Sequence, residues 1–282
     1  QFANRFSNVK HIRHSKNIGG NANIARAFEM ARAEYVWVLC DDDRYDFSYW
    51  TDCQELLHQK PAAIVVATYG KPQCGPAYLF RQLSFVPGAI YRTDLINSTV
   101  LMNMYFNIGN LFPHLAVAAA AINSGKQLPI LSHPLVTMQL SPQDDSYVRG
   151  TETTTYIHPL MKKMFWSLGY LRSIQMLEDK KLREKCSYLV WAEDYTSFYH
   201  FCKIWHIITR KNIVANYFEA LNLLSGKAKL KFAIFVPLYS IFYIYQTDED
   251  IRICLFGKIK IRVWKFSKLK NIVQATLQDE TG

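Results

Sequence analysis

An apolar run that ends in three carboxylates limits the folds that this chain can adopt. Tyr35 to Cys40 reads Tyr-Val-Trp-Val-Leu-Cys, and Asp41, Asp42 and Asp43 follow it directly. A continuous β-favouring run of this kind indicates a strand that is buried on both faces. In open α/β sheets, ligands bind beyond the carboxyl ends of such strands. We therefore expect an α/β fold with a ligand site at the three aspartates.

The segments around this run alternate between strand and helix patterns, which predicts a mainly parallel sheet with flanking crossover helices. Residues 70–88, rich in Pro and Gly, are expected to form a loop over the site. The expected elements are a strand at 9–12, a turn at 17–21, helices at 22–33, 48–59 and 113–124, strands at 62–68 and 88–91, and extended chain at 128–138.

The second half of the chain has a different composition. Residues 157–245 are mostly helical in pattern, and residues 251–263 predict a β-hairpin around Gly257-Lys258. We expect two domains, an α/β domain over residues 1–150 and a basic, mostly helical region over residues 151–282.

Basic charge is concentrated in that second region. Residues 1–145 carry 12 Lys/Arg against 11 Asp/Glu, whereas residues 146–282 carry 21 against 12. A basic surface indicates an anionic partner such as a membrane, or simply a solvated face. Nucleic acid is not expected, because zinc-finger spacing, RNA-binding aromatic motifs and basic heptads are missing from the sequence. The six cysteines, without a C-x-x-C pair, favour reduced and mostly buried thiols in the cytoplasm.

The longest apolar run, Phe232 to Tyr245, is interrupted by Pro237. It is shorter than the roughly 20 residues that span a bilayer. Two interpretations remain open: the run lies in a membrane interface beside Lys227, Lys229 and Lys231, or it is an ordinary buried helix.

The three aspartates predict a metal site. Side chains alternate along a strand, so Asp41 and Asp43 are expected to point to one side and Asp42 to the other. Carboxylate oxygens suit Mg²⁺ or Mn²⁺, and both ions also bind substrate phosphates. The alternative is a charged loop that caps a strand without binding a metal.

The order of these motifs resembles the family 2 glycosyltransferases with the A-type fold. That family shows an N-x-G turn, a helix, a hydrophobic strand and a D-x-D motif in this order and at this spacing. The corresponding segments here are Asn17-Ile18-Gly19, the Ala-rich helix, Glu34 to Leu39, and Asp41-Asp42-Asp43. The resemblance covers residues 8–140, with Gly88 to Arg92 as a weaker part of it.

The resemblance implies a donor site for a nucleotide sugar. Asp41 and Asp43 would hold Mn²⁺ or Mg²⁺ on the diphosphate, and Asp41 and Asp42 would contact the donor. Asn17 and Gly19 would shape the turn that lines the nucleotide pocket. The family's first two strands should precede residue 9, so we expect a chain that is truncated at its amino terminus, with an incomplete nucleotide pocket.

Inverting members of the family need a base for the acceptor hydroxyl, usually an Asp or Glu at the start of the helix after the acceptor loop. The matching position here reads Phe112-Pro113-His114-Leu115 and has no carboxylate. His114 is the candidate base and Asp94 the reserve. The alternative is a His114 that caps the helix or binds acceptor hydroxyls.

Two weaker candidates lie further along the chain. His133, or Asp144 with Asp145, would supply a third metal ligand or a ribose contact, by analogy with A-type enzymes. An ordinary turn is the alternative interpretation of this segment.

The sequence thus supports a metal-dependent, inverting glycosyltransferase that acts on a saccharide or lipid-linked acceptor. The resemblance and the basic second half together suggest surface-polysaccharide or lipopolysaccharide assembly, peripheral at the cytoplasmic face of the cell membrane. The alternative is a non-catalytic protein built on a degenerate transferase domain, which uses residues 146–282 to bind a membrane or a partner.

Overall fold

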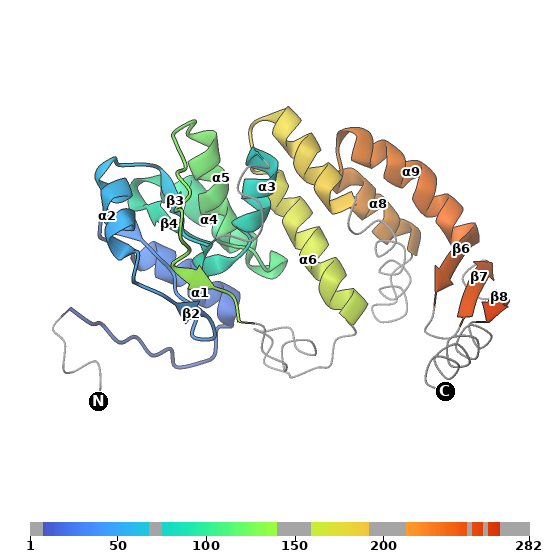
Figure 1. Ribbon diagram of the computed structural model, residues 1–282, viewed down its shortest axis with the longest axis horizontal. Coiled ribbons are helices and arrows are strands. Elements are labelled where there is room, and N and C mark those ends of the chain that lie inside the picture. Colours follow the sequence, from blue (N-terminus) through green and yellow to red (C-terminus); the bar gives the residue numbers. More distant parts are fainter. Residues whose placement is uncertain are drawn as a thin grey trace, which may run out of the picture. The chain divides into compact units, whose positions relative to one another are not determined.

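The computed structural model of the protein describes residues 8–67, 75–139, 159–191, 213–246, 250–255 and 259–265. The chain forms two compact units, Gln1–Leu189 and Val190–Gly282 (Figure 1). The first unit therefore extends past the expected boundary at residue 150.

The first helix, α1 (Gly20–Met30), begins at the predicted turn. Gly19 precedes it with a φ of 79°, a left-handed conformation that glycine adopts without strain. The Asn17 side chain closes the turn by accepting a hydrogen bond from the Gly19 N–H at 2.9 Å. The turn and the helix are confirmed, although the helix starts two residues before residue 22.

The strand expected at residues 9–12 is wrong. These residues form no strand in the part of the chain that the structure describes, and Val9 and Ile12 are exposed. A strand is stabilised by hydrogen bonds to a neighbour, and none of the described strands pairs with this segment.

The central sheet has the order β1-β4-β3, formed by β1 (Tyr35–Val36), β4 (Ala89–Arg92) and β3 (Ala63–Val65). β4 is antiparallel to both neighbours, so β1 and β3 run in the same direction without touching. The expected parallel sheet is thus wrong for the described strands: the crossover through α2 does give two co-directional strands, but β4 inserts between them. An isolated bridge between Val65 and Ile130 is parallel.

The core of the first unit forms around β3. Residues 61–67 are all buried, as the sequence predicted for this run. Helix α2 (Trp50–His58) contributes Cys53 to this core. The other buried members of the cluster come from β3, β4 and the chain around β5 (Val136–Thr137): Ile64, Val66, Ala67, Ile90, Leu131, Leu135 and Val136.

Residues 75–88 are mostly helical, which corrects the expected loop for this part of it. They form α3 (Pro76–Gln82) and the 3-10 turn η2 (Val86–Gly88). Gly75 precedes α3 and Pro76 occupies its first turn, where a missing N–H costs no helical hydrogen bond.

Helices α4 (Ser98–Phe106) and α5 (Leu115–Asn123) pack side by side (Figure 1). The 3-10 turns η3 (Thr93–Leu95) and η4 (Ile108–Asn110) flank α4. Six of the nine residues of α5 are buried, and the chain leaves the helix through Gly125 at a φ of 66°. The Ala-rich helix and its glycine end are confirmed.

Helix α6 (Pro159–Ile174) belongs to the first unit because it packs against η4. The absence of a side chain at Gly169 lets the two backbones meet, and the Arg172 guanidinium donates to Asn110 Oδ1 at 2.8 Å. The Arg81 guanidinium lies 4.7 Å from the ring centre of Trp166 on the same helix. These contacts explain why the compact unit does not end at residue 150.

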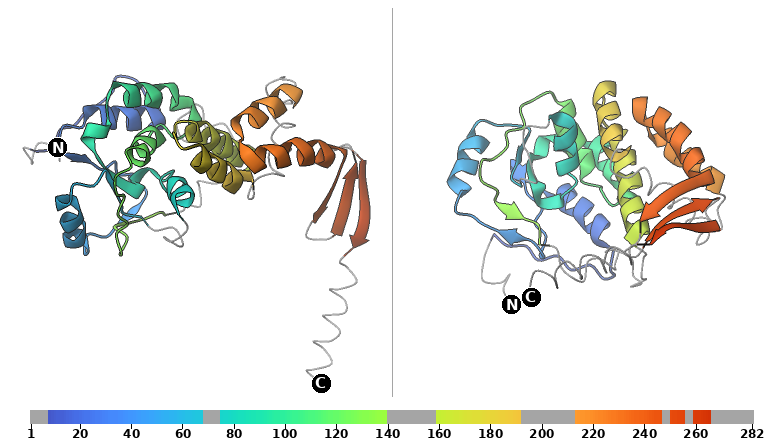
Figure 2. Two further views of the ribbon diagram at one scale, coloured as in Figure 1. Left: turned by 90° about the horizontal axis from the view of Figure 1, so that it is seen from above. Right: turned by 45° about the vertical axis from the view of Figure 1, so that its right-hand side comes forward.

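The second unit contains α8 (Ile213–Leu223), α9 (Gly226–Ile241) and an antiparallel sheet of order β6-β7-β8. Its strands are β6 (Phe242–Gln246), β7 (Asp250–Leu255) and β8 (Ile259–Lys265), and β7 pairs with β8 where the sequence predicted a hairpin. Figure 2 shows α9 continuing directly into β6. None of the described helices is both long and apolar enough to cross a bilayer.

Candidate metal and donor site

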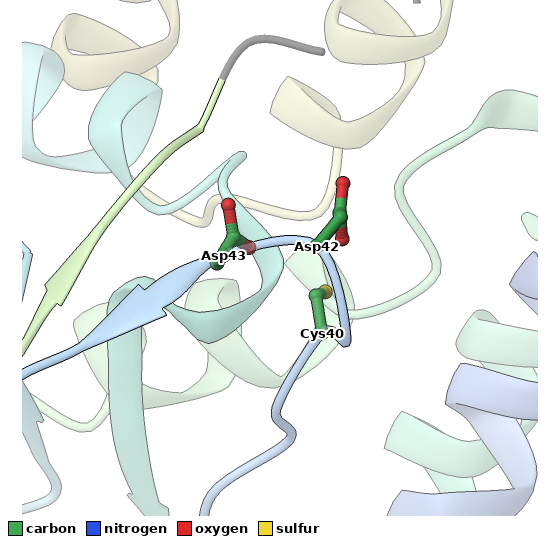
Figure 3. A group of neighbouring side chains, drawn as sticks. All are labelled: Cys40, Asp42 and Asp43. Atoms are coloured by element: carbon green, nitrogen blue, oxygen red, sulfur yellow. The ribbon is translucent and has the colours of Figure 1, made fainter.

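The aspartates lie in a turn between β1 and β2 (Arg44–Tyr45). Cys40, Asp42 and Asp43 each offer one ligand atom, and these three atoms lie within 4.8 Å of one another. Figure 3 shows both carboxylates on the same side of the turn, with Asp43 directly before the strand. The three ligand atoms therefore lie close enough together to be considered for one cation, and we call these residues the converging group.

This geometry corrects the expected alternation. Residues 41 and 42 form a turn, so the strand rule that placed Asp41 with Asp43 does not apply. Asp41 is exposed and lies outside the converging group, whereas Asp42 and Asp43 are partly buried. The strand is also shorter than expected: β1 ends at Val36, and Leu39 is 51% exposed.

Tyr45 holds the turn closed. Its hydroxyl accepts a hydrogen bond from the Cys40 N–H at 2.7 Å and donates one to the Cys40 carbonyl at 2.9 Å. Burial raises the pKa of Tyr45 to about 12, so the hydroxyl keeps the proton that it donates. Asp43 is fixed from the other side, because its Oδ1 accepts from the Gln139 N–H at 3.3 Å.

An aromatic cluster packs around Trp37, next to the turn. Trp37 stacks on Trp50 with ring centres 6.3 Å apart, and meets Tyr45 and Phe47 edge to face. The Trp37 indole also donates to the Pro87 carbonyl at 2.8 Å. This cluster was not predicted, although the density of aromatic residues between positions 35 and 50 is a sequence signal for it.

The donor set suits a divalent cation. Carboxylate oxygens are the ligands that Mg²⁺ and Mn²⁺ prefer, and a neighbouring thiol is tolerated better by the softer Mn²⁺. Cys40 is partly exposed, whereas Cys53 and Cys186 are buried. Because Asp42 and Asp43 are partly exposed, coordination positions remain open to phosphate oxygens or water.

The Asn17 turn has the local role that the resemblance implied for it. Its side chain is used inside the turn, on the Gly19 N–H. Helix α1 is anchored further along, where Asn21 donates to the Ile108 carbonyl at 2.7 Å. Asn17 and Gly19 therefore shape the start of α1, and their part in a nucleotide pocket stays a prediction.

His114 lies inside the first unit and is fully buried. Its Nε2 lies 3.1 Å from the carbonyl oxygens of both Leu83 and Ser84, so this nitrogen carries the proton and donates. Nδ1 is buried without a hydrogen-bond partner. Burial lowers the pKa of His114 to about 4. In this conformation neither nitrogen is open to an acceptor hydroxyl.

Asp94 lies at the other end of the sheet from the aspartate turn. β4 runs antiparallel to β1 with Arg92 opposite Tyr35, so Asp94 lies beside the start of β1, whereas Asp42 follows its end. Asp94 binds the Arg92 guanidinium at 2.5 Å, and that hydrogen bond lowers the pKa of the carboxyl. The structure thus gives Asp94 an ion-pairing role.

Of the weaker candidates, His133 stacks on Tyr49 with ring centres 4.0 Å apart. Tyr49 is the residue that precedes α2. Asp144 and Asp145 lie outside the described residues. Among the residues that the structure describes, His133 is not part of the group formed by Cys40, Asp42 and Asp43.

Comparison with known families bears directly on this turn. Residues 1–119 match the family described as glycosyl transferase family 2. The match supports a family 2 glycosyltransferase domain. The matched segment contains the aspartate turn, Asn17 and His114. The match indicates sugar transfer from a nucleotide-sugar donor to an acceptor. Enzymes of this family often use divalent metal ions. No curated protein matches the chain, and no solved structure matches it.

Proposed function

We propose that this protein transfers a sugar, with inversion, from a nucleotide-sugar donor to a saccharide or lipid-linked acceptor, and that the transfer depends on Mn²⁺ or Mg²⁺. The observation that carries the proposal is the convergence of Asp42 and Asp43 within the family 2 match. An acidic turn is common on protein surfaces, and the match gives this one a chemical role.

Asp42 and Asp43 would hold the cation, with Cys40 beside them. The chemistry supplied by a bound cation is neutralisation of the charge that develops on the departing nucleoside diphosphate. Asp41, exposed on the same turn, would contact the donor. Tyr45 and the aromatic cluster keep the carboxylates in place before the donor arrives, which reduces the loss of freedom on binding.

Neither His114 nor Asp94 is assigned as the general base in the described conformation. His114 is enclosed by Leu83 and Ser84, and Asp94 is paired with Arg92 at the far end of the sheet. A general base must come within hydrogen-bond reach of the proton that it removes. Neither His114 nor Asp94 is presented to an acceptor in the described conformation, and this favours the second candidate function, a non-catalytic protein built on a degenerate transferase domain that binds a membrane or partner through residues 146–282.

We place the protein in surface-polysaccharide or lipopolysaccharide assembly, peripheral at the cytoplasmic face of the cell membrane. The support is the basic second half of the chain, with 21 Lys/Arg against 12 Asp/Glu in residues 146–282. A basic surface is attracted to the anionic lipids of a membrane.

The test is calorimetric titration of UDP-, GDP-, CDP- and dTDP-linked sugars with and without Mn²⁺. If the protein transfers a sugar, one nucleotide class should bind and Mn²⁺ should strengthen the binding. Adding an extract that contains the acceptor should then lead the protein to release the nucleoside diphosphate. Metal-coupled binding without release would favour the non-catalytic function. Lack of any metal-coupled binding would reject sugar transfer and leave the non-catalytic function.

A further inference from the structure

Helix α9 is apolar on two opposite faces, and the residues that the structure describes cover only one of them. Ala228, Phe232 and Val236, spaced by four residues, are buried. Phe232 stacks on Tyr217 with ring centres 5.4 Å apart and meets Trp191 edge to face at 6.2 Å. This inner face holds α9 to its own unit, so the opposite face needs a separate explanation.

The opposite face consists of large apolar side chains in contact with solvent. Leu230 is 63% exposed, Ile234 48%, Leu238 46% and Ile241 45%. Their spacing of four, four and three residues places them in one line along the helix. We call these four residues the outer stripe. A helix that is apolar all round is normally buried in protein or in lipid, so a stripe of this kind marks an interaction surface.

Positive charge lies at one end of the outer stripe. Lys227 precedes Leu230 by three residues and so shares its face, and Lys229 is exposed on the same turn. With Lys231, α9 carries three lysines and no acidic residue between Gly226 and Ile241. All three are in the first turns of the helix, where the free N–H groups add positive potential.

We propose that the outer stripe docks α9 on an anionic lipid surface, with the helix lying in the interface. Lysines at the first turns would meet lipid phosphates, while Leu230, Ile234, Leu238 and Ile241 enter the boundary between headgroups and acyl chains. Sixteen residues of helix extend about 24 Å, less than the roughly 30 Å of a bilayer core. The helix therefore lies on the membrane and does not cross it.

Charge complementarity favours lipid over a second copy of this chain. A second α9 would bring three more lysines and no carboxylate to meet them. An anionic bilayer offers both components of the required surface, negative headgroups and an apolar layer a few ångströms deeper. The inference deepens the proposed function by naming the membrane-contacting surface, and it rests on the membrane placement proposed above.

The test is sedimentation of the full chain with phosphatidylcholine vesicles, with or without phosphatidylglycerol. We expect sedimentation mainly with the anionic vesicles. The variant Ile234→Ser/Leu238→Ser should lose most of it, and Lys227→Glu/Lys229→Glu should lower the partition coefficient by about tenfold or more, since each lysine near an anionic surface contributes about fivefold. Added salt should weaken the lysine contribution.

Matched variants in the other unit control for general loss of apolar area or charge. Met102→Ser/Phe106→Ser removes two exposed apolar side chains from α4, and Lys180→Glu/Lys181→Glu reverses two exposed lysines. Neither should change sedimentation. Because all of these positions are on the surface, circular dichroism and the unfolding midpoint should stay unchanged.

Two outcomes would overturn the proposal. In the first, the outer-stripe variant sediments with vesicles as much as wild type does. In the second, light scattering shows that wild type is a dimer and that the outer-stripe variant is a monomer. Donor binding with Mn²⁺ is measured on the same samples. An outer-stripe variant that binds donor but not vesicles separates this surface from the transfer site. Vesicle binding without donor binding would instead reject the proposed function and leave the docking surface in place.

Discussion

The hydroxyl of Tyr45 bridges the backbone N–H and the carbonyl of Cys40, at 2.7 Å and 2.9 Å. One side chain on β2 thereby closes the turn between Cys40 and Tyr45, which carries all three aspartates. Both bonds stay intact over the usual pH range, because burial raises the pKa of Tyr45 to about 12. The position of the carboxylates thus depends on a residue that does not contact the proposed metal.

Replacing this hydroxyl should weaken the proposed metal site without unfolding the protein. In Tyr45→Phe the Cys40 backbone loses both partners, which lowers the free energy of unfolding by about 2 kcal/mol. Affinity for Mn²⁺ with donor should fall by about 10- to 100-fold, as for other residues that orient metal ligands. Calorimetric titration measures the affinity and urea unfolding the stability.

Tyr35→Phe is the matched control. Tyr35 lies at the other end of the same chain segment, and its hydroxyl donates to the Pro61 carbonyl at 3.0 Å. This variant should lose stability by about 1 kcal/mol and keep its metal affinity. Equal losses of metal affinity in both variants would show that Tyr45 acts through general stability.

His114 should make the stability of the protein depend on pH. Burial lowers its pKa from 6.5 to about 4, so the unfolded chain binds this proton more readily than the folded chain. The contribution of neutral His114 to the free energy of unfolding is fully present above pH 6.5. About 3 kcal/mol of this free energy is lost as the pH falls to about 4. Urea unfolding across this range, compared with His114→Gln, isolates the contribution.

The same variant tests the role of His114 in catalysis. His114→Gln keeps a donor for the Leu83 and Ser84 carbonyls, so it should fold and turn over within a few-fold of wild type. A loss of roughly 10²–10⁴-fold, with a wild-type rate that falls on the acid side through the histidine range, would instead show that His114 becomes exposed and acts as the base.

Gly169 is required for the contact between α6 and η4. A methyl group on it would lie 1.9 Å from the Asn110 carbonyl oxygen, a backbone atom that cannot move aside cheaply. Gly169→Ala should lower the free energy of unfolding by about 3 kcal/mol. Gly20→Ala, at the start of α1 with nothing within 4 Å, should be neutral or stabilising by less than about 1 kcal/mol. A tolerated Gly169→Ala would contradict the close packing of α6.

Local signals were sufficient to predict most helices and the buried strand at β3. Gly19 precedes one helix and Gly125 follows another at positive φ angles, which glycine adopts without strain. This preference can be recognised in the sequence. The direction of β4 was not predictable in the same way, since strand direction depends on which distant segment inserts between β1 and β3. The sequence also could not show that α6 belongs to the first unit, because that contact depends on Gly169 meeting Asn110.

The metal site itself stays a prediction, and the structure changes which of the aspartates are candidates for it. Three carboxylates that follow an apolar run predicted a metal site at this point of the chain. The pairing of Asp41 with Asp43 depended on a strand, and a turn brings Asp42 and Asp43 together with Cys40 instead. The burial of His114 under Leu83 and Ser84 is a tertiary contact across about 30 residues of sequence, which no local pattern carries.

The metal site is tested by measuring Mn²⁺ binding in the presence of a nucleoside diphosphate, by electron paramagnetic resonance, in Asp41→Asn, Asp42→Asn and Asp43→Asn. We predict that Asp42→Asn and Asp43→Asn lose Mn²⁺ affinity by about 100-fold, in line with removal of a charged ligand. Asp41→Asn should keep Mn²⁺ affinity to within a few-fold, because its side chain lies outside the converging group. Unchanged Mn²⁺ affinity in Asp42→Asn and Asp43→Asn would contradict the proposed metal site.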